Sequence, residues 1–158
     1  MGLTDNRTSS GYEGGQPKYL TFRIDDRRYG LPLSCVRELD SLGSITGVPG
    51  APGYIKGLAN LRGKAIPVMD VRMRLGSGKA DYGKHTCYIV VGLDADEVGL
   101  VVDETGKIVR IDDRAKLPPE GFAKGAEARF MDGVVVAEGK ALYLIDMQKL
   151  LYAGDQGE

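Results

Sequence analysis

The chain is 158 residues long, which is enough for one or two small domains with a hydrophobic core. Hydrophobic residues make up 42% of it and charged residues 27%, an ordinary balance for a soluble globular protein. The formal net charge of −1 excludes a general electrostatic attraction to nucleic acid or to anionic membranes.

The N-terminal part predicts a tail followed by two strands. Residues 1–17 are rich in glycine and small polar residues, so we expect a disordered tail. Apolar and polar residues then alternate from 20 to 24, which predicts a half-buried strand. The chain turns at Asp25 and its neighbours and returns through residues 29–33 as a second strand.

The next segment, residues 34–39, has two interpretations. Val36 and Leu39 are spaced three apart, which suits one helical turn, but the segment also suits the end of a strand. Residues 44–48 form a short apolar run, and the prolines and glycines that follow predict an irregular connection.

A hairpin is predicted from residues 54–61 and 65–70. Gly63 lies between the two runs and can adopt the positive φ that a tight turn needs. Pro67 cannot donate a ladder hydrogen bond, which indicates an edge or a bulge. Asp70 then suits the N-cap of a short helix, and Gly76 suits the position just after its end.

The second half of the chain repeats the pattern of the first. At an offset of 76 residues Gly133 falls on Gly57, and at an offset of 69 residues Tyr88 falls on Tyr19. Chance matching of common residues is the alternative, but order, spacing and a repeated Gly-Lys-Ala turn favour a duplication. We therefore expect one all-β unit used twice.

The remaining elements complete the second unit. A polar connector at 79–85 separates the two. Strands are predicted at 87–93, 98–102, 108–111, 134–137 and 141–145, with a long loop at 117–129, a short helix at 147–152 and a frayed tail at 153–158. About five strands per unit suffice to close a small barrel, which removes exposed sheet edges. The expected barrels span about 18–78 and about 86–146.

No motif in the sequence predicts catalysis. The Gly63-Lys64 segment has the wrong glycine spacing for a phosphate-binding loop, and Ala65 stands where Ser or Thr would bind magnesium. The single histidine, His85, lies in the polar connector and is expected to be solvated. Cys35 and Cys87 lie in apolar runs without metal-ligand spacing, so we expect buried thiols. We expect no enzyme, no metal and no cofactor.

A surface for binding another protein is what remains, since interfaces favour apolar and arginine anchors. Val36, Glu38 and Leu39 would form such a patch beside Gly57 and Arg62, if the hairpin folds over them. Glu38 and Arg62 are candidates for an ion pair. The alternative is two solvated charges on opposite strands.

The hairpin also carries a resemblance to a known family. Ile-Lys-Gly-Leu-Ala-Asn-Leu-Arg-Gly at 55–63, followed by Ile-Pro-Val-Met-Asp-Val-Arg at 66–72, resembles the signature of the CheW family of chemotaxis coupling proteins. Further matches follow in family order from about 18 to 152. The resemblance implies two five-stranded SH3-like β-barrels packed side by side, with short helices after the strands.

The resemblance also implies a function and partners. Such proteins are non-catalytic cytoplasmic adaptors that connect the cytoplasmic tip of methyl-accepting chemoreceptors to the regulatory domain of the histidine kinase CheA, within membrane receptor arrays. By position it implies receptor contacts in a groove between the barrels at Val36, Glu38, Leu39, Gly57, Arg62 and Cys87. It implies a kinase contact at Phe122.

Three alternatives stay open at this point. One is a paralogous CheW-like adaptor of another chemosensory-type pathway, serving motility or a non-flagellar output. Another is a detached regulatory domain of the kinase, against which the short N-terminal tail argues. The third is a barrel enzyme of another kind, which would need a pocket with convergent polar groups.

Overall fold

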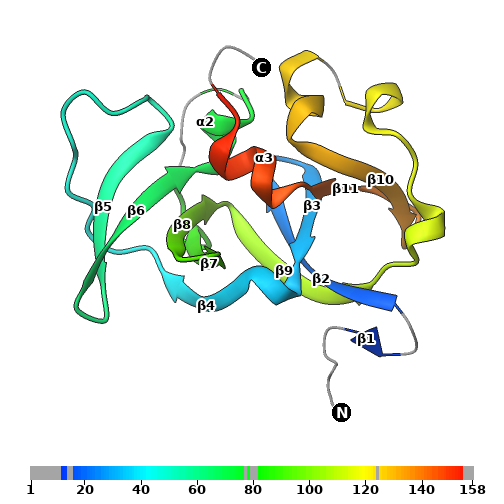
Figure 1. Ribbon diagram of the computed structural model, residues 1–158, viewed down its shortest axis with the longest axis horizontal. Helices are drawn as coiled ribbons and strands as arrows, with labels where there is room; N and C mark the ends of the chain where they lie inside the picture. Colours follow the sequence, from blue (N-terminus) through cyan, green and yellow to red (C-terminus); the bar gives the residue numbers. More distant parts are fainter. Residues whose placement is uncertain (1–11, 14–15, 77, 79–81, 124, 155–158) are drawn as a thin grey trace. The chain divides into compact units, whose positions relative to one another are not determined.

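The computed structural model describes residues 12–13, 16–76, 78, 82–123 and 125–154 (Figure 1). It divides the chain into two compact units, and neither is continuous in sequence. Unit 1 contains Met1–Phe22, Asp26–Ser34 and Gly106–Glu158, and unit 2 contains Arg23–Asp25 and Cys35–Thr105.

Unit 2 is built on a five-stranded sheet in the order β4-β7-β8-β6-β5. Its strands are β4 (Val36–Ser41), β5 (Ile55–Leu61), β6 (Lys64–Asp70), β7 (Cys87–Leu93) and β8 (Asp96–Val102). Neighbours in this order run antiparallel, except for β6 and β8, which run parallel. The short helix α2 (Val71–Arg74) follows β6.

Unit 1 is built on the other sheet, in the order β1-β2-β3-β11-β10, with β9 also paired to β2. Its strands are β1 (Tyr12–Glu13), β2 (Gln16–Ile24), β3 (Arg27–Pro32), β9 (Glu104–Arg110), β10 (Met131–Ala137) and β11 (Lys140–Ile145), and the helix α3 (Met147–Tyr152) follows them. Short 3₁₀ turns lie at η1 (Leu33–Cys35), η2 (Asp113–Ala115), η3 (Pro119–Gly121) and η4 (Gly125–Phe130).

The two sheets close by the same device. In unit 2, the chain beyond β4 meets β5 through two backbone hydrogen bonds between Thr46 and Leu58, of 2.9 and 2.8 Å. In unit 1, the chain beyond β9 meets β10 through two between Leu117 and Val134, of 2.8 and 2.9 Å. The end strands of each sheet are thereby joined, as in a small barrel. The prediction of an all-β fold of two small barrels is confirmed.

The strand pairing crosses the continuous ranges 18–78 and 86–146 that the repeat predicts. The hairpin β2–β3 belongs to the first repeat but pairs with β11 of the second, and β8 of the second repeat pairs with β6 of the first. Both junctions are parallel pairs at the same place in the repeat. Each unit therefore takes strands from both repeats, an exchange that a local sequence pattern does not reveal.

The predicted turns and caps are confirmed. Arg62 and Gly63 have φ values of 53° and 81° in the β5–β6 turn, the left-handed conformation that a two-residue hairpin requires. Asp70 caps α2, because its carboxylate accepts a hydrogen bond of 3.1 Å from the amide of Met73. Gly76, with φ 83°, lies just after the C-cap Leu75, as expected of a C′ glycine.

Other boundaries differ from the expected ones. Within the range expected as a disordered tail, β1 occupies Tyr12–Glu13 and β2 begins at Gln16; residues 1–11 and 14–15 lie outside the described residues. At 34–39 both interpretations hold in part, because the 3₁₀ turn η1 ends at Cys35 and β4 begins at Val36.

Each unit has its own hydrophobic core. In unit 2 it is centred on Val68, Tyr88 and Val101, and in unit 1 on Val135 and Leu142 with their neighbours. None of the helices in the described part of the chain is long and apolar enough to cross a membrane.

Candidate functional site

The predicted receptor-contact residues all lie in unit 2, around the line where its end strands face each other. We call this line seam 2, and define it by strand β4 and by the hairpin from Ile55 to Lys64. Val36, Glu38 and Leu39 lie on β4, and Gly57 and Arg62 lie on the hairpin. Cys87 begins β7, where it pairs with Ser41 of β4.

Glu38 and Arg62 meet across seam 2. A guanidinium nitrogen of Arg62, Nη2, lies 2.5 Å from Oε1 of Glu38. The side chain of Glu38 is 19% exposed, whereas that of Arg62 is 70% exposed. The hairpin turn therefore presents the guanidinium to solvent, and a sheltered carboxylate holds its position. The ion pair suggested by the sequence is confirmed.

The charges around this pair are predominantly acidic. A hydrogen bond with Asp40 raises the pKa of Glu38, and its desolvation adds to the effect, while Arg62 opposes it. A second ion pair, of 3.0 Å, joins Lys64 to Glu97. Three carboxylates thus accompany two cations at seam 2.

Burial alternates along β4 and divides the expected patch. Glu38 is half-buried, whereas Leu39 is 49% exposed. Because successive side chains of a strand point to opposite faces, Leu39 points away from the ion pair. The expected continuous patch is therefore split between the rim of the barrel and its outer face.

Leu39 and Cys87 instead line a common cleft of about 600 Å³. Its wall also includes Leu42 and the polar side chains of His85 and Glu104. Burial raises the pKa of the Cys87 thiol, although a hydrogen bond with Thr105 opposes the shift. The thiol is therefore neutral at neutral pH, and the cleft offers an apolar wall and a polar wall to a partner side chain.

Gly57 has a structural role at seam 2. It is buried with φ 142°, in the register shift between Ile55 and β6. A Cβ at this position would lie 2.0 Å from the carbonyl oxygen of Thr46, which is part of the closing bridge. The glycine is thus required for barrel closure, whether or not a partner touches it.

Phe122 lies in unit 1, directly after η3. Its side chain is exposed, and its amide donates a hydrogen bond of 2.9 Å to the carbonyl of Pro119. The structure thus presents an aromatic ring on a short, hydrogen-bonded turn, which suits the expected contact with a partner.

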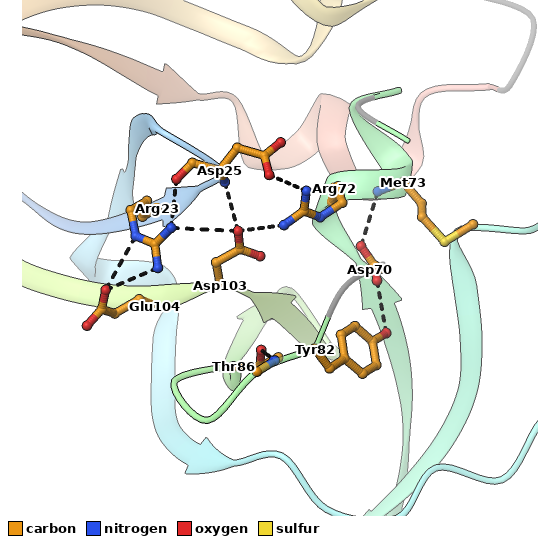
Figure 2. Close-up of polar contacts among 10 residues, drawn as sticks. Arg23, Asp25, Asp70, Arg72, Met73, Tyr82, Thr86, Asp103 and Glu104 are labelled. Carbon is orange, nitrogen blue, oxygen red and sulfur yellow. Dashed lines mark hydrogen bonds and ion pairs between the residues drawn. The ribbon is translucent and has the colours of Figure 1, made fainter. Parts of the chain in front are cut away.

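A charged network in unit 2 was missed by the reasoning from sequence (Figure 2). Arg72, on α2, is largely buried and binds the carboxylates of Asp25 and of Asp103, the latter at 2.6 Å. Asp103 also accepts a hydrogen bond of 2.7 Å from the amide of Asp25, and Arg23 pairs with Glu104 at 3.2 Å. The available signal was a break in the repeat, since Gln148 stands at the position equivalent to Arg72.

The network fixes structure and forms no reaction centre. Every strong donor of Arg72 that Figure 2 draws is directed at a carboxylate of its own unit. Among the described residues, no three His, Cys, Asp or Glu side chains converge as the ligands of a metal ion would.

Comparison with known proteins gives consistent matches. The family model of the CheW-like domain matches residues 18–155. Chemotaxis protein CheW of Rhizobium meliloti (strain 1021) is 31% identical over 136 residues, 86% of this chain and 88% of that protein. Protein FrzA of Myxococcus xanthus is 32% identical over 98% of this chain and 97% of that protein. The crystal structure of scaffolding protein TtCheW from Thermoanaerobacter tengcongensis matches with a TM-score of 0.79 at 31% identity, over 90% of this chain and 96% of that chain.

Proposed function

Because the chain belongs to the CheW family, we propose that it is a non-catalytic chemotaxis adaptor that couples chemoreceptors to the histidine kinase CheA. The proposal places it in the cytoplasm, at arrays of membrane receptors. Its partners are the cytoplasmic tip of methyl-accepting chemoreceptors and the regulatory domain of the kinase.

The observation that carries the receptor half of this proposal is the Glu38–Arg62 pair. Arg62 is exposed at a hairpin tip but held by a sheltered carboxylate, so less side-chain entropy is lost when it binds. A receptor helix that hydrogen-bonds to Arg62 and packs against Leu39 and the cleft beside Cys87 would use both walls of seam 2. Val36 supports the strand from the half-buried side.

The kinase half of the proposal depends on Phe122. An exposed aromatic ring on a short turn is a typical interface anchor, and it lies in unit 1 whereas the receptor residues lie in unit 2. The adaptor then transmits a signal because receptor states differ in their affinity for it, which needs no reaction on this chain.

The test is the binding of a purified receptor cytoplasmic fragment to the Arg62→Ala variant. We expect binding to fall about tenfold or more, as for a central arginine anchor, with an unchanged circular dichroism spectrum. The matched control is Arg114→Ala, because Arg114 is exposed and pairs only with its neighbour Asp112 among the described residues. Undiminished binding by Arg62→Ala would remove Arg62 from the receptor site.

The kinase contact and the pathway need a second measurement. Phe122→Ala should weaken co-elution with the kinase regulatory domain and leave receptor binding intact. Co-elution with candidate kinases and receptors also separates the chemotaxis adaptor from a paralogous adaptor of another chemosensory-type pathway, because the two differ in the proteins they bind.

A further inference from the structure

Unit 1 contains a counterpart of seam 2 with the charges reversed. We call it seam 1, and define it by Lys107 and Ile108 of β9 and by the stretch from Val136 to Lys140. At the two offsets of the repeat, Lys107 stands for Glu38 and Glu138 stands for Arg62. Lys107 and Glu138 form an ion pair, so the contact across the seam persists although both of its charges are exchanged.

The outer side of seam 1 is more apolar than that of seam 2. Ile108 stands for Leu39 and is 52% exposed, and Val136 stands for Asn60 and is 73% exposed. Their chain neighbours Val109 and Ala137 pack against the core of unit 1. Because side chains alternate along a strand, Ile108 and Val136 point outward from the two strands that the ion pair joins.

Basic side chains surround this apolar pair. Glu138 is the partner of Lys107 and lies 3.9 Å from a guanidinium nitrogen of Arg28. The hydrogen bond from Lys107 lowers the pKa of Glu138 most, with smaller contributions from Arg28 and Lys140. Three cations thus accompany one carboxylate, the opposite of the acidic excess at seam 2.

We propose that seam 1 is a second protein-docking surface, which takes a partner segment with apolar side chains flanked by carboxylates. The apolar groups would cover Ile108 and Val136, and the carboxylates would meet Lys107, Arg28 and Lys140. Single exposed apolar residues are common on protein surfaces, but here two lie beside one ion pair and share a basic rim. The reversed charge disfavours the segment that suits seam 2, since like charges in an interface are repelled.

The test uses two synthetic helical peptides with the same stripe of leucines at i, i+3, i+4 and i+7. One carries glutamates beside the stripe and the other carries lysines. Each is titrated into the full-length ¹⁵N-labelled protein, and amide shifts are followed. We expect the acidic peptide to saturate with a Kd below about 1 mM, with the largest shifts at Ile108 and Val136, and the basic peptide not to saturate.

Matched variants locate the site. Ile108→Ser should weaken binding of the acidic peptide about tenfold, and Lys140→Glu roughly threefold. The equivalent changes at seam 2, Leu39→Ser and Lys64→Glu, should leave it unchanged. Thermal unfolding of each variant shows that the fold is retained, as expected for exposed positions.

Three results would overturn the proposal. They are no saturable shift with the acidic peptide, equal binding of both peptides, and equal weakening by Leu39→Ser and Ile108→Ser. A concentration-dependent dimer that buries Ile108 without peptide would replace the proposed partner with a second copy. No receptor or kinase is used, so failure here leaves the proposed adaptor function standing.

Discussion

Gly57 lies directly beneath the carbonyl of Thr46, at a distance that leaves no room for a side chain. The two residues come from the end strands of unit 2, and their approach is part of the bridge that closes the sheet. This contact links the most characteristic hairpin of the sequence to the closure of the barrel.

Gly57→Ala should therefore be strongly destabilising. Its φ of 142° costs a non-glycine residue about 1–3 kcal/mol, and the clash with the Thr46 backbone adds to that cost. We expect urea unfolding to show a loss of at least about 3 kcal/mol.

Two glycines serve as controls for this change. Gly63 has φ 81° but open space around a Cβ, and Gly133 has a close contact of 3.1 Å with the Leu117 carbonyl. Gly63→Ala should cost only about 1 kcal/mol, and Gly133→Ala should fall between the two. A Gly57 variant as stable as Gly63→Ala would show that the bridge yields easily.

Arg72→Ala should loosen the turn at Asp25. The substitution leaves Asp25 and Asp103 facing each other without their cation, and the buried position of Arg72 makes that loss felt. We expect about 2 kcal/mol less stability and faster hydrogen exchange at the Asp25 amide, which donates to Asp103. Arg114→Ala, at a fully solvated pair, should change neither quantity. Unchanged exchange at Asp25 would show that the turn holds without the arginine.

The Cys87 thiol should react slowly with alkylating reagents. Burial raises its pKa, and the thiolate is the reactive form. In the Cys35→Ser variant, where Cys87 is the remaining thiol, alkylation by iodoacetamide near pH 8 should be about tenfold slower than in urea. Equal rates in both conditions would place Cys87 in open solvent. A bound receptor fragment should slow the reaction further if it covers the cleft.

Tyr29 should make stability depend on alkaline pH. Its hydroxyl is buried and donates a hydrogen bond of 3.2 Å to Glu127, and burial raises its pKa above the ordinary value of 10.0. The folded state then holds a proton that the unfolded state releases, so stability is full below pH 10 and falls above it. The unfolding free energy of Tyr29→Phe should fall less steeply there, by up to about 1.4 kcal/mol per pH unit. Parallel slopes for the two proteins would contradict this assignment.

The sequence was sufficient for local structure, because local structure is determined by neighbouring residues. The turn at Gly63, the cap at Asp70 and the repeat that doubles them follow from the conformations that glycine and aspartate prefer. Strand partners do not follow, because an alternating pattern shows which face of a strand is buried but not which strand lies beside it. The exchange of hairpins between the two repeats was missed for that reason.

The candidate site shows the same division. Glu38 and Arg62 were expected to pair and do so. Leu39 was expected beside them because helical spacing puts Val36 and Leu39 on one face. A strand begins at Val36 instead, and its period of two turns Leu39 outward.

The exchanged hairpins imply that neither half of this chain is a folding unit. A chain cut in the connector at 79–85 would yield two fragments, each with half of two barrels and none whole. A single ancestral copy would have met the same difficulty, and the same parallel junction would have solved it by pairing two identical chains into a domain-swapped dimer. On this view the duplication joined two subunits that already depended on each other, and the two fragments made separately should fold only when mixed.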